Sequence, residues 1–263
     1  LTLAYKANEI EKNQNNDIVK ELKIFYNCCD EIMRFVDDTF TMIHDNMNNN
    51  ILIEGAQGAL LDIDFGTYPF VTSSNPSIGG ISTGLGIPGS KIDTVIGIFK
   101  AYTTRVGKGP FPTELNNQIG EELRKIGKEF GATTGRARRC GWFDGVAAKY
   151  SIMFNGITDI AITKLDILDT FKDIKFCIGY KVNDKIVKNM SELIHNLDNV
   201  IPIYKQFKGW QCDTTSVSEF NKLPVLAQNY LNFISEFLET PVSYISNGPN
   251  TNQIIKNFKY SLN

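Results

Sequence analysis

Residues 51–89 read ILIEGAQGALLDIDFGTYPFVTSSNPSIGGISTGLGIPG and contain the most informative pattern in the chain. The apolar run at 51–53 predicts a buried strand that leads into a glycine-rich loop. This loop carries a carboxamide, Gln57, and a hydroxyl cluster at 72–74. Glycine lets the backbone approach a ligand closely, and exposed N–H groups in such turns bind anions. We therefore interpret the stretch as a binding loop for a small anionic molecule; the alternative is a long surface loop without a ligand.

Composition limits the kinds of ligand. The chain has 263 residues, of which 42% are hydrophobic, so it can bury a core as one large domain or two small ones. A net charge of −2 argues against nonspecific binding to nucleic acid or to membrane surfaces, and no apolar span of about 18 residues is present. Five cysteines, an odd number without metal-ligand spacing, favour a reducing compartment. We expect a cytoplasmic protein with small ligands.

Helical and strand patterns alternate along the rest of the chain. Helical spacing covers residues 17–48, 119–128, 144–154 and 226–238, and strand patterns cover 95–102, 159–163, 176–182, 200–204 and 242–245. Asp144 stands at the expected N-cap of its helix, and the region 17–48 is expected to cover a sheet. The alternation predicts an α/β fold with a mainly parallel central sheet flanked by helices and a smaller mixed α+β excursion.

Two strand ends carry candidate binding residues. The segment TKLD at 163–166 places Lys164 and Asp166 at the carboxyl end of a strand, where open α/β sheets bind ligands. An aspartate there can accept hydrogen bonds from N1–H and the 2-amino group of guanine, whereas adenine lacks this donor pair. The segment SNGP at 246–249 follows another strand and offers a hydroxyl and backbone N–H groups to the same base. The alternative is an exposed strand end without a ligand.

The segment GATTGRARRCGW at 131–142 is dense in arginine. Arg136, Arg138 and Arg139 follow two hydroxyls, Thr133 and Thr134. Guanidinium groups bind carboxylate and phosphate bidentately, so this loop is suited to a small dianion or a nucleotide. A solvated charged turn is the alternative, although glycines in the loop would let the backbone fold around a ligand.

Other motifs are absent or misleading. Glycines 84, 86 and 89 satisfy the spacing of a dinucleotide fingerprint, but no strand precedes them and Pro88 interrupts them. The sequence has no phosphate loop for a triphosphate, and its two histidines, His44 and His195, lie far in sequence from every candidate motif, so we do not expect them to be catalytic. The catalytic machinery in this chain is therefore incomplete.

Taken together, the segments GAQG, DIDFGTYPFVTSSN, KAYTTRVGKGPFPTEL, EFGATTGRARRCGW, TKLD and SNGP occur in this order from about residue 50 onward and resemble the adenylosuccinate synthetase family. The resemblance implies a P-loop-NTPase-like α/β fold and a homodimer. It also implies ligation of IMP to L-aspartate at the expense of GTP, with Mg²⁺. The products would be adenylosuccinate, GDP and phosphate on the route to AMP, formed through a 6-phosphoryl-IMP intermediate.

The resemblance assigns roles to matching positions. IMP would be bound by Gln57, Leu61, Thr72, Val106 and Arg136, and Gln57 would support charge on the purine 6-oxygen as a catalytic residue. The aspartate loop would comprise Ala132, Thr133, Thr134, Gly135, Arg136, Ala137 and Arg138. GTP would be bound by Arg138, Lys164, Leu165, Asp166, Ser246, Asn247 and Gly248. Ala137 departs from the basic residue that is usual in the family.

The resemblance also implies that the chain, which begins with Leu1 rather than methionine, is the C-terminal portion of a single domain. Its parts would be a helical region (1–50), the IMP and aspartate loops with the core (51–170), and a subregion completing the guanine site (171–263). The phosphate loop, a catalytic aspartate that also ligates Mg²⁺, and a catalytic histidine are then expected upstream, with no metal ligand in this chain. We expect the chain alone to be inactive; the rival interpretation is a noncatalytic guanine-nucleotide-binding or scaffold module.

Overall fold

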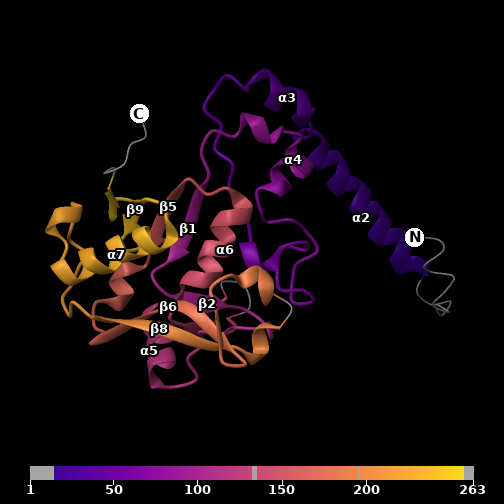
Figure 1. Ribbon diagram of the computed structural model, residues 1–263. Coiled ribbons are helices and arrows are strands. Elements are labelled where there is room, and N and C mark those ends of the chain that lie inside the picture. Colours follow the sequence, from indigo (N-terminus) through magenta and orange to yellow (C-terminus); the bar gives the residue numbers. More distant parts are fainter. Residues whose placement is uncertain (1–14, 132–134, 195, 258–263) are drawn as a thin grey trace. The chain divides into compact units, whose positions relative to one another are not determined.

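A computed structural model describes residues 15–131, 135–194 and 196–257, and its helices and strands are labelled in Figure 1. The chain divides into two compact units, residues 1–52 and residues 53–263. In the first unit, helices α2 (Asn15–Met33) and α3 (Thr39–Asp45) confirm the helical prediction. Asp38 accounts for the break between them, because its carboxylate accepts a hydrogen bond from the Thr41 N–H at 3.1 Å and caps α3. That this region covers a sheet stays a prediction.

The strand predicted at residues 51–53 is wrong. These residues have no regular secondary structure, and the Leu52 side chain is 92% exposed. A strand requires a neighbouring backbone to pair its N–H and C=O groups, and none of the described residues pairs with this run. An apolar sequence alone therefore did not specify a strand here.

The central sheet of the second unit is mainly parallel, as predicted. Strands β1 (Ile96–Lys100), β5 (Asp159–Thr163) and β9 (Val242–Ser246) run parallel, and β10 (Ile254–Lys256) adds an antiparallel edge. Lys100 pairs with Thr163, and Ile162 pairs with Ile245. The carboxyl ends of the three parallel strands therefore meet at one edge of the sheet.

A second sheet forms the mixed excursion. Its long strands β6 (Asp173–Val182) and β8 (Ile201–Lys208) are antiparallel, with β7 (Lys185–Val187) and β4 (Phe143–Asp144) added to β6. Two further short strands, β2 (Thr103–Arg105) and β3 (Arg139–Gly141), pair separately. Sequence patterns missed β2, β3, β4 and β7 because two or three residues are too few to show alternation.

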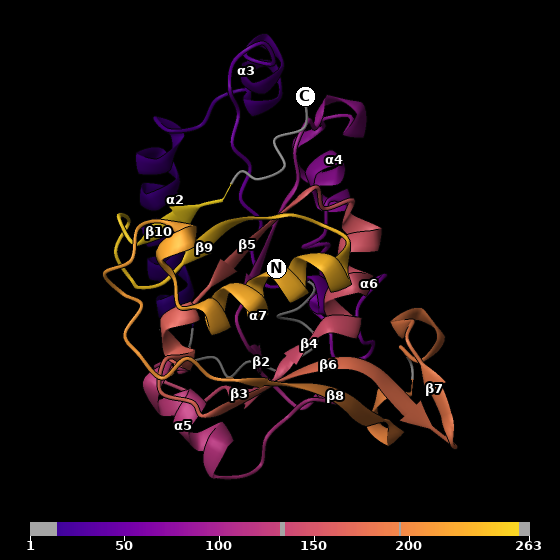
Figure 2. The same cartoon turned by 60° about the vertical axis from the view of Figure 1, so that its left-hand side comes forward.

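Helices pack the two sheets together. In Figure 2, α7 (Val225–Leu238) lies between the β5–β9–β10 layer and the β6–β8 layer, and α6 (Gly145–Asn155) contacts both α7 and β6. Buried side chains of α7, such as Tyr230 and Ile234, join Ile162 and Phe176 from the two sheets in one core. The other helices of the described residues are α4 (Gly79–Leu85), α5 (Gln118–Ile126) and the short 3₁₀ turns η2 (Ala59–Leu61), η3 (Gly89–Lys91), η4 (Leu165–Leu168), η5 (Met190–Glu192), η6 (Leu197–Asn199) and η7 (Phe220–Lys222). In the described part of the chain, no helix has the length and apolar character needed to span a bilayer.

Asp144 caps α6, as predicted, and is a buried carboxylate. It accepts hydrogen bonds from the Ala147 N–H at 3.1 Å and from the Tyr180 hydroxyl at 2.8 Å. Burial nevertheless raises the pKa of Asp144 to about 6 from its usual 3.8, because the hydrogen bonds only partly offset the loss of hydration.

This shift predicts a pH-dependent stability. The folded chain binds the Asp144 proton more tightly than the unfolded chain, so the stabilisation is fully present below pH 3.8 and is lost as the pH rises through about 6. In urea titrations, the free energy of unfolding of wild type minus that of Asp144→Asn should fall across this range with a slope approaching about 1.4 kcal/mol per pH unit. A difference that does not change with pH would contradict the assignment.

Candidate functional site

Two candidate binding residues, Lys164 and Ser246, lie at the common edge of the parallel strands, together with Lys100, which was not singled out from the sequence. Lys100 ends β1, Ser246 ends β9, and Lys164 follows β5. Lys164 has a left-handed φ of 60°, which is uncommon for a side chain with a Cβ, and it begins the turn η4. Leu165 is fully buried and anchors this turn, while Asp166, the second residue of the turn, stays partly exposed. The backbone strain at Lys164 therefore lies where the sequence predicts the base site.

Asp166 has the environment of a ligand-binding carboxylate. Partial burial raises its pKa, and the nearby negative charge of Asp213 adds to the shift while Lys164 opposes it. Within the described residues, its carboxylate makes no hydrogen bond to another side chain. Its oxygens are therefore not committed to a structural side-chain partner.

The segment at 246–248 forms a hydrogen-bonded turn beside this edge. The Ser246 hydroxyl donates to the Gly248 carbonyl at 3.0 Å, and the Asn247 amide donates to the carbonyls of Thr214 and Val217. A Cβ at Gly248 would come within 2.3 Å of the Gln253 side chain, so glycine fits the close packing there. The Asn247 Oδ1 atom is buried and has no partner in the described chain, which leaves one acceptor in the turn for a donor from outside.

The arginine-rich loop has a well-defined stem. The Arg138 N–H donates to the Glu129 carbonyl at 2.9 Å, and the Gly131 N–H donates to the Arg136 carbonyl at 2.8 Å. Gly135 has a φ of 64°, the left-handed region that glycine enters without strain, whereas Arg136 and Ala137 are exposed. The predicted aspartate-binding residues Ala132, Thr133 and Thr134 lie outside the described residues.

The three arginines of this segment have different environments. The Arg139 guanidinium binds both carboxylate oxygens of Glu114 and also donates to the carbonyls of Gly107 and Gly109. Its donors therefore brace the segment 107–114 instead of facing a ligand, which corrects the expectation of three ligand-binding cations. Arg138 is 31% exposed and pairs through one nitrogen with Glu129 at 2.8 Å.

Sequence reasoning missed Glu129, the most highly connected carboxylate of the site. It follows α5, is fully buried, and accepts hydrogen bonds from Lys100, Lys164, Arg138 and the Tyr102 hydroxyl. Burial alone would raise the pKa of Glu129, but these donors lower it to about 2. The only signal in the sequence was a charged residue next to the apolar Phe130 in the segment EFGATTG.

Two of the predicted IMP residues are joined directly. The Thr72 N–H donates to the Leu61 carbonyl at 2.8 Å, which closes the loop between them. Asp62 organises this loop, because its buried carboxylate accepts from the Ser77 hydroxyl at 2.5 Å and from the backbone N–H groups of Asp64 and Phe65. Thr72 is therefore held at a fixed position relative to Leu61.

Arg105 ties the Val106 segment to the same loop. Its guanidinium donates to the Thr67 hydroxyl at 2.6 Å and to the Phe70 carbonyl at 3.2 Å. Burial, together with the neighbouring Arg139 charge, lowers the pKa of Arg105 to about 10. Val106 itself is 53% exposed. Such exposure is expected of a residue whose backbone contacts a ligand.

Gln57 is exposed and has a left-handed φ of 62°. For a residue with a Cβ this conformation costs free energy, and such strain is concentrated at functional sites. The hydrogen bonds of Thr72 and Arg105 bring Leu61, Thr72 and the Val106 segment together. Gln57 lies on the loop that precedes them in the chain.

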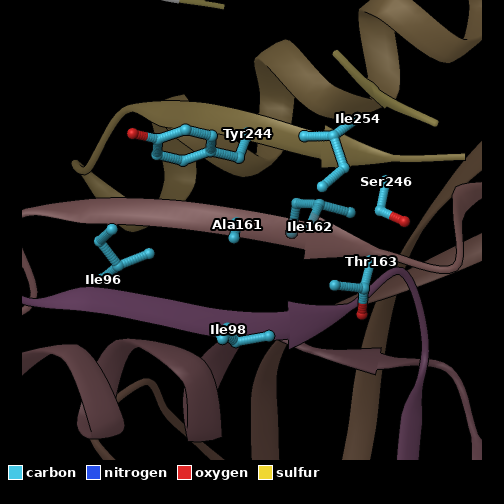
Figure 3. Close-up of a pocket in the computed structure, with 8 residues that line it drawn as sticks. All are labelled: Ile96, Ile98, Ala161, Ile162, Thr163, Tyr244, Ser246 and Ile254. Atoms are coloured by element: carbon cyan, nitrogen blue, oxygen red, sulfur yellow. The ribbon is translucent and has the colours of Figure 1, made fainter. Parts of the chain in front are cut away.

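The central sheet also has an apolar hollow on its face (Figure 3). The hollow measures about 270 Å³ and is lined by Ile96, Ile98, Ala161, Ile162, Thr163, Tyr244, Ser246 and Ile254. Ile98 is 71% exposed, and apolar surface of this kind is typical of a contact surface. With so few polar groups, this hollow is not suited to phosphate.

A metal site is not evident in the part of the chain that the structure describes. No three histidine, cysteine, aspartate or glutamate side chains there are grouped closely enough to hold a metal ion. The described residues thus do not provide Mg²⁺ with a set of carboxylate ligands.

Comparisons with known proteins identify the family that this chain resembles. The family model for adenylosuccinate synthetase matches residues 2–255. Adenylosuccinate synthetase of Yarrowia lipolytica is 47% identical over 241 residues, which are 91% of this chain and 56% of the relative. That of Candida tropicalis is 49% identical over 235 residues, or 89% of this chain and 55% of the relative.

A solved structure extends the match to the fold. The structure of fully ligated adenylosuccinate synthetase from Plasmodium falciparum superimposes with a TM-score of 0.88 at 40% identity, covering 97% of this chain and 60% of that one. The chain spans about half the length of the curated relatives it matches. The family match over nearly all of the chain and the shared α/β fold lead to one assignment: this chain belongs to the adenylosuccinate synthetase family.

Proposed function

We propose that the complete gene product containing this chain ligates IMP and L-aspartate to adenylosuccinate with GTP as the co-substrate. The observation that carries the proposal is the convergence at one sheet edge. The turn with Lys164 and Asp166 and the turn at 246–248 follow adjacent strands, and the stem of the arginine loop is tied to the same edge through Glu129. A base site and an anion-binding loop are thereby held next to each other.

In this proposal the base site selects guanine. Asp166 accepts hydrogen bonds from N1–H and the 2-amino group of guanine, and Ser246, Asn247 and Gly248 close over the base. The unpartnered Asn247 Oδ1 and the Asp166 carboxylate, which has no side-chain hydrogen-bond partner among the described residues, support this role. Leu165 contributes indirectly, because its burial fixes the turn that presents Asp166.

The first chemical step transfers the terminal phosphoryl group of GTP to the 6-oxygen of IMP, breaking its bond to the β-phosphate oxygen so that GDP leaves. The N1 proton of IMP passes to the catalytic aspartate that the family resemblance implies. Gln57 donates a hydrogen bond to the 6-oxygen as negative charge develops there. Thr72 holds the IMP phosphate, and backbone groups of Leu61 and Val106 line the nucleotide. Mg²⁺, when bound, would offset negative charge on the phosphates.

In the second step the amine of aspartate attacks carbon 6 of the purine and the phosphate leaves with the former 6-oxygen. Arg136 and Arg138 hold the carboxylates of aspartate and thus orient its amine. Arg136 also contacts the IMP ribose, and Arg138 reaches the GTP side. We further propose a cytoplasmic homodimer in which residues 51–170 bind IMP and aspartate and residues 171–263 complete the guanine site.

The proposal is tested with IMP labelled with ¹⁸O at the 6-position. The complete gene product, supplied with GTP, aspartate and Mg²⁺, should form adenylosuccinate and transfer the label to inorganic phosphate, as followed by mass spectrometry. Omission of aspartate should prevent net adenylosuccinate formation. Binding of GTP without any product in the complete reaction would instead support a noncatalytic guanine-nucleotide-binding module.

A further inference from the structure

Glu129 occupies the centre of a charge cluster that spans several elements. Its Oε1 atom accepts from Lys164 at 2.8 Å and from the Tyr102 hydroxyl at 2.6 Å, and its Oε2 atom accepts from Arg138 at 2.8 Å. Lys100 lies 2.9 Å from both oxygens. We call these five residues the Glu129 cluster.

The cluster is arranged with its negative charge inside. Glu129 is fully buried, while the side chains of Lys100, Arg138 and Lys164 are 26%, 31% and 33% exposed. Three cations surround one carboxylate, so the cluster has an excess of two positive charges, and its cations keep part of their surface toward solvent. Neutralising the buried carboxylate would leave three cations in close proximity without their common partner.

The cations come from parts of the chain that are distant in sequence. Lys100 ends β1, Lys164 begins the turn with Asp166, and Arg138 closes the stem of the arginine loop. Lys164 also donates to the Gly127 carbonyl at 2.6 Å, just before Glu129. One carboxylate thus connects the base site with the anion-binding loop.

We propose that Glu129 is a positioning residue that holds Lys164 and Arg138 together, so that the guanine site and the aspartate loop are organised as one unit. This inference rests on the proposed function, because it assigns those two residues to GTP and aspartate. Glu129 itself contacts no substrate, since it is enclosed by the cluster. A carboxylate with a purely structural role would affect stability and the fraction of active protein but not the KM values.

The kinetic test compares Glu129→Gln with Glu129→Asp in the complete gene product. Glu129→Gln keeps the shape but removes the charge, so the KM for GTP and that for aspartate should both rise about tenfold, with less than a threefold change for IMP. Glu129→Asp keeps the charge on a shorter side chain, so its KM values for GTP and aspartate should rise less than those of Glu129→Gln. Asp144→Asn, which removes the charge of a buried carboxylate outside the cluster, should leave the KM values unchanged.

A second measurement needs no substrate. Hydrogen–deuterium exchange at the amides of Gly131 and Arg138, which close the loop stem, should be faster in Glu129→Gln than in wild type and in Asp144→Asn. KM values for GTP and aspartate within twofold of wild type, with unchanged exchange at the stem, would overturn the inference. A wild-type protein that forms no adenylosuccinate would overturn the proposed function instead. In that case the comparison of hydrogen–deuterium exchange between wild type and Glu129→Gln would alone decide whether Glu129 holds the loop.

Discussion

Replacing Asp166 with Asn in the complete gene product is expected to lower the preference for GTP over ATP by about a hundredfold or more, mainly through loss of GTP use. A carboxylate accepts from both N1–H and the 2-amino group of guanine, whereas an amide can accept from only one of them and turns its own N–H donor toward the other. A bound base would cover these groups, so the mismatch would leave polar groups unpaired away from water, which is costly. The ratio of kcat/KM values for the two nucleotides measures the effect.

Xanthosine triphosphate provides a chemical rescue for this variant. Xanthine has an oxygen where guanine has the 2-amino group, so the amide introduced by Asp166→Asn can donate to that oxygen while accepting from N1–H. The variant should therefore use xanthosine triphosphate better than wild type does. Asp213→Asn removes an exposed charge that influences Asp166 and should leave the nucleotide preference unchanged. Equal use of ATP and GTP by wild type would refute the role of Asp166.

The sequence predicted those parts of the fold whose pattern is local. The parallel strands β1, β5 and β9 and the helices α5, α6 and α7 each contain enough residues for alternation or helical spacing to be visible. Asp144 was identified as a cap because capping depends on residues within one helical turn. The run at 51–53 failed because a strand also needs a pairing partner, which local pattern cannot supply.

The site was predicted only where a motif is contiguous. Lys164 and Asp166 occur in one short segment that follows a strand, so their place at the sheet edge could be inferred. The role of Glu129 depends on partners 29 residues upstream and 35 residues downstream in the chain, and one sequence does not show which charges meet. For the same reason Arg138 and Arg139 looked equivalent, although their carboxylate partners, Glu129 and Glu114, give them different roles.

The aspartate loop should depend strongly on Arg138. Arg138→Leu removes the proposed charge-assisted contact to an aspartate carboxylate, which should cost about 1.5 to 3 kcal/mol, or roughly ten- to a hundredfold in affinity. The same change deprives Glu129 of one of its donors and loosens the loop stem. The KM for aspartate should therefore rise far more than that for IMP, with a smaller rise for GTP.

Direct binding of an aspartate analogue such as succinate is the clearer measurement for this variant, because KM equals a dissociation constant only when chemistry is slow relative to dissociation. Titration in the presence of IMP and a GTP analogue should show the ten- to hundredfold loss of affinity given above. Lys125→Leu is the matched control: it removes an exposed positive charge in the last turn of α5 with the same replacement residue, and it should leave analogue binding unchanged. If Arg138→Leu abolished IMP binding and left analogue binding intact, the loop would have to be reassigned to the nucleotide.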